Sequence, residues 1–149
     1  IPHTFDDYYL HVSIAAPMLS LGTDVRKKDV DYDKLRKYLG IWRAIAVNYF
    51  GDFYPITSCT KDSAVWIAWQ YNRPEAGEGV VQAFRRDQCM YAGADLKLKE
   101  LEPQAQYELH HIEQGETRIM SGQELMKKGL FIRIPDMPGA AIITYKKMK

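Results

Sequence analysis

Carboxylates are the side chains that could carry acid–base chemistry here, and three of them gather in the N-terminal stretch: Asp6, Asp7 and Asp24. Two carboxylates can act as acid and base on one bond only when a fixed distance separates them. Asp6 and Asp7 do not fit this requirement, because consecutive side chains diverge on a helix and on a strand. We interpret all three as capping or surface residues and predict no catalytic residue in this chain.

Histidines could supply metal ligands, and two groups of them invite that interpretation. His3, Asp7 and His11 lie close together in sequence, and His110 is followed directly by His111. No H-E-x-x-H spacing is present, and adjacent histidines on a strand point to opposite faces. We therefore predict structural or exposed roles for these histidines, no metal site and no cofactor.

Two other catalytic motifs are absent from the sequence. Ser121–Gly122 is not part of a G-x-S-x-G nucleophile elbow. Gly77 and Gly79 lack the third glycine and the following helix of a phosphate-binding loop. The sequence therefore gives no sign of a serine hydrolase or a nucleotide-binding protein.

Aromatic side chains could form a stacking platform for a sugar ring, and five candidates stand out: Tyr54, Trp66, Trp69, Tyr71 and Phe84. Alternation along the predicted strand 65–71 places Trp69 and Tyr71 on one face and Trp66 on the other. Both faces are largely apolar, so we predict that an opposing sheet covers one and a neighbouring helix the other. Trp66 and Trp69 are the candidates for carbohydrate contact if either face is open.

Composition limits the classes of partner. The chain has 149 residues, of which 46% are hydrophobic, and 20 Lys and Arg balance 19 Asp and Glu to a net charge of +1. The two signs are interleaved, so we predict no nucleic-acid partner and no anionic membrane surface. No apolar run approaches the roughly 20 residues needed to cross a bilayer. Cys59 and Cys89 are too few for a disulfide framework, and the compartment stays open.

The clearest helix signal runs over about residues 31–50. Apolar residues recur there at intervals of three and four, which places them on one helix face: Leu35, Tyr38, Leu39, Trp42, Ile45, Ala46 and Tyr49. Asp31 is the predicted N-cap, and Gly51 is predicted to end the helix in the left-handed conformation. So wide an apolar stripe predicts that the helix packs against a large surface.

After Pro55 the pattern changes to short strands separated by turn residues. Seven strands are predicted: 65–71, 80–84, 94–98, 107–110, 117–120, 130–134 and 140–145. Between them, Ser121 and Glu124 have capping-box spacing for one helical turn. The chain is therefore predicted to be mainly β, an antiparallel β-sandwich of about seven strands over residues 58–149, preceded by a helical segment over residues 1–57.

Several segments, in consistent order, resemble the C-terminal part of family 36 glycoside hydrolases, the melibiase-like α-galactosidases. The segments at 19–25, 42–45 and 51–55 resemble the end of that family's catalytic barrel, and those at 68–70 and 80–86 its first sandwich hairpin. Residues 98–107 resemble L-x-G-L-D-P-x-A-x-Y, with Glu100 in place of the usual glycine. Residues 121–130 resemble S-G-x-x-L-M-x-x-G-L.

The resemblance implies a parent enzyme in which a (β/α)8 barrel precedes this sandwich. Residues 1–57 would then be the C-terminal remnant of the barrel, and the family's two catalytic aspartates would lie upstream of Ile1, a first residue that itself suggests a cut or processed product. The implied partners are the upstream catalytic barrel of the same parent chain, the parent's carbohydrate substrate and a homo-oligomer.

On this interpretation the chain is an accessory domain, not catalytic alone, that stabilises an enzyme acting on terminal α-galactosides. Two alternatives from other classes stay open. One is a free-standing carbohydrate-binding module that uses Trp66 or Trp69 as its platform. The other is a structural interaction domain.

Overall fold

The computed structural model describes residues 6–19, 21–22, 24 and 26–149. Its elements follow in chain order: α1 (Asp7–Ser13), α2 (Tyr32–Ile45), the 3-10 helix η1 (Ala46–Phe50), β1 (Asp52–Pro55), β2 (Ile67–Arg73), β3 (Glu78–Arg85), β4 (Gly93–Leu96), β5 (Gln106–His111), β6 (Thr117–Ser121), α3 (Gly122–Lys127), β7 (Leu130–Arg133) and β8 (Gly139–Lys147). Among the described residues, no helix is long and apolar enough to span a membrane.

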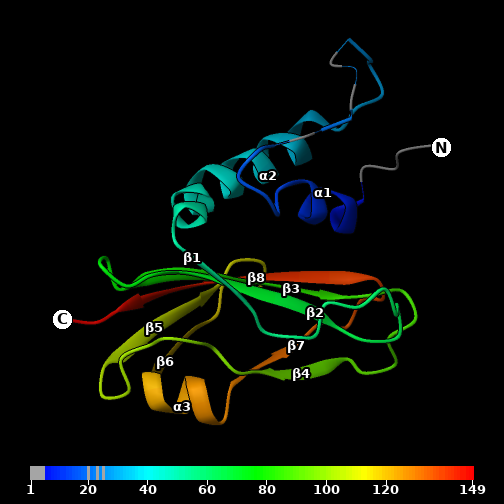
Figure 1. Cartoon of the computed structure of the whole chain (residues 1–149). Coiled ribbons are helices and arrows are strands. Elements are labelled where there is room, and N and C mark those ends of the chain that lie inside the picture. Colours follow the sequence, from blue (N-terminus) through cyan, green and yellow to red (C-terminus); the bar gives the residue numbers. More distant parts are fainter. Residues whose placement is uncertain (1–5, 20, 23, 25) are drawn as a thin grey trace.

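The strands form two antiparallel sheets, which confirms the predicted fold class. A six-stranded sheet has the order β1-β2-β3-β8-β5-β6, and a second sheet pairs β4 with β7. Figure 1 shows three layers: α1 and α2 on one face of the large sheet, and β4, β7 and α3 on the other. All seven predicted strands are present, and the eighth, β1, is one that the sequence pattern did not indicate.

Two hydrophobic clusters hold the layers together, one on each face of the large sheet. Residues of β3 divide between them: Val81 and Ala83 point into the sandwich, whereas Val80 points toward the helices. This division explains why almost every residue of β3 is buried and why its sequence shows no polar alternation. Leu125 of α3 closes the sandwich core from the far side.

The predicted long helix is present as α2 and continues directly into η1. Asp31 is its N-cap, as predicted, and its carboxylate accepts a hydrogen bond from the amide of Lys34 at 2.9 Å. The helix does not bury the whole predicted stripe equally. Ile45 is fully buried and packs on the sheet, while Leu39 and Trp42 are only partly buried.

The predicted role of Gly51 as a left-handed cap is wrong. Its φ is −84° and its backbone is extended. Glycine is required there for a different reason: a Cβ at this position would lie 2.3 Å from the carbonyl oxygen of Asn72. The chain passes so close to β2 because β1 begins immediately after Gly51 and pairs with that strand.

Glu100 is the only non-glycine residue among those described that has a positive φ, at 52°. The turn that contains it is held from inside the sandwich by β2. The Gln70 amide bonds both the N–H and the C=O of Lys99, and Asn72 donates to the carbonyl of Glu100. Tyr145 joins the two strand residues, donating to Asn72 at 2.7 Å and accepting from Gln70 at 2.8 Å.

Among the described residues before α2, the one helix is the short α1, which has Asp6 as its N-cap. The described residues between 19 and 25, which resemble a barrel strand in sequence, lie in neither a helix nor a strand. The division of the chain at residues 57 and 58 stays a prediction, and β1 is the one strand that lies before it.

Candidate functional site

The three acidic residues of the N-terminal stretch are engaged in local contacts. Asp6 caps α1 by accepting from the amide of Tyr9 at 2.7 Å. Asp7 pairs with Lys34 at 3.3 Å, and Asp24 lies 2.8 Å from the guanidinium of Arg26. The hydrogen bonds from Arg26 hold the pKa of the Asp24 carboxyl below its usual range, which opposes a role as proton donor.

Trp66 is part of the sandwich core. Its side chain is buried, with 6% of the residue exposed, and its ring nitrogen donates to the carbonyl oxygen of Tyr91 at 2.8 Å. A platform for a sugar must present a free ring face. The packing around Trp66 offers no such face in this structure.

Trp69 lies on the opposite face of β2, beneath the helical layer. Its ring packs against Phe84 with 5.2 Å between centroids, and Tyr8 of α1 meets Phe84 edge-on at 5.9 Å. The indole nitrogen donates to Gln82 at 2.8 Å. Trp69 is only half buried, so part of its ring stays accessible. Of the two tryptophan candidates, Trp69 is the less enclosed.

The described residues contain no group of three or more His, Cys, Asp or Glu side chains arranged to hold a metal ion. His3, one of the suggested ligands, lies outside the described residues. His110 and His111 point to opposite sides of β5, as the strand geometry predicts, with His110 exposed and His111 directed inward. Cys59 and Cys89 are both free thiols.

A polar cluster joins the helical layer to the sandwich, and the sequence pattern did not indicate it. Glu113, in the turn after β5, lies between two imidazoles: its Oε1 is 3.3 Å from Nε2 of His11, and its Oε2 is 3.3 Å from Nδ1 of His111. The same Oε2 accepts from the backbone amide of Ile142 at 3.1 Å. We call His11, His111 and Glu113 the junction cluster.

Each imidazole of the junction cluster has one buried nitrogen without a partner, Nδ1 of His11 and Nε2 of His111. His11 is the more enclosed, with 4% of its side chain exposed, and burial lowers its pKa below the ordinary 6.5. Glu113 opposes this shift, since a nearby carboxylate favours the charged imidazole. The cluster lines a cavity of about 370 Å3 between α1, α2 and β8.

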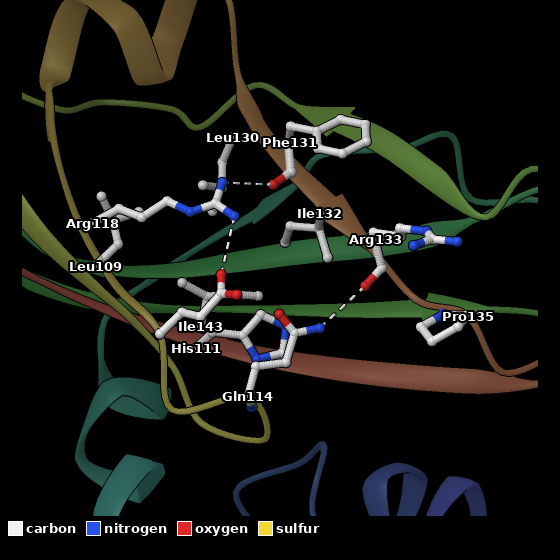
Figure 2. A pocket seen from close by; sticks show the side chains of 11 residues that line it. Leu109, His111, Gln114, Arg118, Leu130, Phe131, Ile132, Arg133, Pro135 and Ile143 are labelled. Carbon is white, nitrogen blue, oxygen red and sulfur yellow. Dashed lines mark hydrogen bonds and ion pairs between the residues drawn. The ribbon is translucent and has the colours of Figure 1, made fainter.

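A second hollow lies on the sandwich itself, as Figure 2 shows. This cleft of about 400 Å3 opens between β6 and β7, and its floor is aliphatic: Leu109, Leu130, Ile132 and Ile143. Arg118 and Gln114 cross it and donate to the carbonyl oxygens of Phe131 and Arg133, each at 3.5 Å. These are long hydrogen bonds, so the two side chains cover the cleft only loosely.

Three carboxylates, Asp7, Glu113 and Asp136, line the cavity at the junction, where Asp7 is paired with Lys34 and Glu113 with the two histidines. Further polar groups are paired at the same junction between the helices and the large sheet. Beside the junction cluster, Gln82 of β3 donates to the phenol oxygen of Tyr49 at 3.0 Å, and that phenol donates to the carbonyl of Ile14. The chemistry of these groups is suited to holding the two layers together.

Comparison with known proteins gives one family match. The family described as glycosyl hydrolase family 36 C-terminal domain matches residues 66–141, just over half of the chain. This range begins at Trp66 and ends within β8, so it covers most of the sandwich. A comparison with curated protein sequences gives no match.

Solved structures of other proteins share the fold, among them the following two. A variant of the GH36 α-galactosidase AgaA from Geobacillus stearothermophilus, in complex with 1-deoxygalactonojirimycin, matches 84% of this chain at 19% identity with a TM-score of 0.65. The galactosidase domain of the α-galactosidase–sucrose kinase AgaSK matches 80% of the chain, also at 19% identity, with a TM-score of 0.64. The chain spans only 17% and 16% of the lengths of those two proteins, respectively.

Proposed function

Because the chain belongs to the family of glycosyl hydrolase family 36 C-terminal domains, we propose that it is the accessory β-sandwich of an enzyme that hydrolyses terminal α-galactosides. The family match confirms the resemblance carried by the sequence motifs. The chain would not catalyse the reaction itself: an upstream barrel of the same parent chain would hold the catalytic aspartates, and the sandwich would stabilise that barrel.

One observation carries the proposal beyond the family match. The helical layer leaves apolar side chains exposed to water, and the most exposed is Phe50, at 91%. Val47, three residues earlier, is 45% exposed. Leaving such surface in water is unfavourable by roughly 25 cal/mol per Å2. A barrel continuing from these helices would cover it.

The lengths of the two matched proteins indicate how large the proposed upstream barrel would be. Each is about six times as long as the portion that this chain matches. An α-galactosidase barrel placed before α1 would account for both the added length and the exposed apolar residues. It would also give the junction between helices and sandwich a role, namely to hold the end of the barrel against the large sheet.

The experiment compares one substitution in two settings. Phe50→Ser should leave the thermal stability of this chain alone unchanged, because the side chain is already exposed. In the full-length parent the same substitution should lower the thermal midpoint and shorten the half-life of α-galactosidase activity. Met90→Ser, at an 82% exposed residue between β3 and β4, is the matched control and should be neutral in both settings. A neutral Phe50→Ser in the parent would contradict the proposal.

The carbohydrate-binding module stays the alternative prediction, with Trp66 and Trp69 as its candidate residues. Half-burial of Trp69 is the observation in its favour. Enclosure of Trp66 in the core weighs against that residue. The third alternative, a structural interaction domain, shares with our proposal the need for a protein partner on the helical layer.

A further inference from the structure

Helix α1 is held on the sandwich partly through the junction cluster. His11 comes from the helix, while Glu113 and His111 belong to the sandwich, so the contact at 3.3 Å between Nε2 of His11 and Oε1 of Glu113 links the two units. We propose that the junction cluster is a pH-sensitive contact, which holds α1 on the sandwich while His11 is neutral and weakens when His11 takes up a proton.

The geometry fixes where the added proton must go. With Nε2 directed at a carboxylate oxygen, neutral His11 carries its hydrogen on Nε2 and donates to Glu113. The proton taken up on charging must therefore bind Nδ1. That atom is buried and has no hydrogen-bond partner. A buried N–H of a cation without an acceptor is unfavourable, so the docked helix resists protonation.

The second imidazole cannot relieve this arrangement. Nδ1 of His111 lies 3.3 Å from the Glu113 carboxylate and also 3.3 Å from the backbone amide of Gln114. It can donate to the carboxylate or accept from the amide, but one nitrogen cannot do both in one tautomer. The Glu113 carboxylate already accepts from the amide of Ile142 and lies beside both imidazoles. It therefore offers no acceptor to Nδ1 of a charged His11.

Charged and titratable groups face His11 from every element around it: Asp7 on α1, Lys37 and Tyr38 on α2, and Glu113 and His111 on the sandwich. Arg133 and Asp136 line the same cavity. The two carboxylates nearest to His11 favour its charged form, whereas Lys37 and His111 oppose it. Burial is the largest influence, and the pKa of His11 is lowered as a result.

The sign of the pH effect follows from this direction. When α1 is undocked, His11 titrates near its ordinary value of 6.5, and when α1 is docked it titrates lower. Well above pH 6.5 the residue is neutral in both forms, so docking has its full strength. Below 6.5 the undocked form takes up the proton first, and the docking equilibrium falls by up to about tenfold per pH unit until the docked form also protonates.

Helix α1 is short, so one unfavourable proton can shift its docking, although Asp7 also pairs with Lys34 and Tyr49 donates to the carbonyl of Ile14. The helix has seven residues, and an isolated helix of that length is marginal in water. Its buried apolar contacts come from Leu10 and from Ile14 at its C-cap, together with the edge-on contact of Tyr8 with Phe84. The strands of the large sheet do not depend on His11, so they serve as an internal reference.

The test measures hydrogen exchange of backbone amides in this chain between pH 7.5 and 5.5, corrected for the intrinsic effect of pH on exchange. We expect protection at the amides of Leu10 and Ile14, which bond within α1 and its cap, to fall with pH. Protection in β3 and β8 should stay constant. In parallel, NMR titration of the histidine Cε1 protons should give His11 a pKa below 6.5.

Three variants separate the titration from ordinary packing. In His11→Gln the amide still bonds Glu113 but does not titrate, so protection of α1 should become independent of pH. In Glu113→Gln the carboxylate that favours the charged imidazole is removed, so the pKa of His11 should fall further. His110→Gln, at the exposed neighbour of the cluster on β5, is the matched control and should behave as the unmodified chain.

Three results would overturn the inference: α1 protection that does not change with pH in the unmodified chain, a measured His11 pKa at or above 6.5, or unaltered pH dependence in His11→Gln. If His11→Gln fails to dock α1 at any pH, the NMR titration of the unmodified chain still decides the question. None of these measurements involves the parent enzyme, so the outcome is independent of the proposed accessory function.

Discussion

The side-chain amide of Gln82 donates to the phenol oxygen of Tyr49 at 3.0 Å, and this bond joins η1 to the centre of the large sheet. The other end of the same amide accepts from the indole nitrogen of Trp69 at 2.8 Å. Burial raises the pKa of Tyr49 to about 12, so the phenol stays protonated and donates onward to Ile14. One buried glutamine therefore connects three elements.

Replacing Gln82 should weaken the fold more than the loss of one hydrogen bond suggests. In Gln82→Leu, the indole N–H of Trp69 loses its acceptor and the phenol of Tyr49 loses a donor. We expect a loss of about 1–3 kcal/mol in the free energy of unfolding, measured by urea denaturation. The control is Gln104→Leu, at an exposed glutamine. Equal stability of the two variants would show that the buried amide is not important.

The apolar stripe of α2 should contribute unequally to stability. Ile45 is fully buried, so Ile45→Ala should destabilise by about 2–5 kcal/mol. Trp42 is only partly buried in this chain, and Trp42→Ala should fall below the roughly 3–5 kcal/mol expected for a fully buried tryptophan. Phe50→Ala is the exposed control. Equilibrium denaturation of the three variants checks this order, and a larger loss at Trp42 than at Ile45 would contradict it.

Substitution of Glu100 should be able to raise the stability of the fold, because its backbone adopts a conformation that is unfavourable for residues with a Cβ. At φ 52°, Glu100→Gly should raise the free energy of unfolding by about 1 kcal/mol. Glu100→Val should lower it, since β-branched residues tolerate this region least. Glu102→Gly, two residues later at an ordinary φ, should not stabilise. A stabilising effect at both positions would point to loss of negative charge as the cause.

The chain alone should not hydrolyse an activated aryl α-galactoside above background, whereas the full-length parent should. Catalysis requires an acid and a nucleophile or base held at a fixed separation. Asp7 and Asp24 are instead paired with Lys34 and Arg26. A rate assay at equal concentrations, with Asp7→Asn and Asp24→Asn beside it, makes the test. Turnover that disappears in either variant would refute the accessory interpretation.

Galactosides should not change the tryptophan fluorescence of this chain. Trp66 is enclosed and Trp69 is covered in part by Phe84, so neither ring presents a wholly free face. The measurement is a titration with galactosides and longer oligosaccharides. A saturable change that Trp69→Ala removes, while the circular dichroism stays that of a folded sandwich, would favour the binding-module alternative instead.

Much of the sandwich could be predicted because the signals are local. Each of the seven indicated strands is bounded by turn residues, and the Ser121–Glu124 capping box forms as expected. Strand β1 was missed, because its four residues are mostly exposed and end in a proline, so no apolar alternation marks it. Its assignment depends on pairing with β2, which is a long-range contact.

The junction cluster could not be predicted either, because it too depends on contacts between residues far apart in sequence. His11 and Glu113 are far apart in sequence, and neither belongs to a motif with metal-ligand or catalytic spacing. Gln82 likewise lies within an apolar strand, where its partners Tyr49 and Trp69 are determined only by the packing of helices on the sheet. A buried glutamine inside an otherwise apolar strand was the one local sign, since such a group must find partners.

Only Gly51 separates the 3-10 helix from β1, and this tight connection limits where recombination could divide the chain. A recombination point at residues 57 and 58 would transfer β1 with the upstream part and leave Ile67–Arg73 as an unprotected edge strand. The replacement upstream part would have to supply a matching strand in the correct register. Recombination between homologues should therefore exchange residues 31–149 as one piece. Helix α2 and η1 would then stay with the large sheet on which they pack.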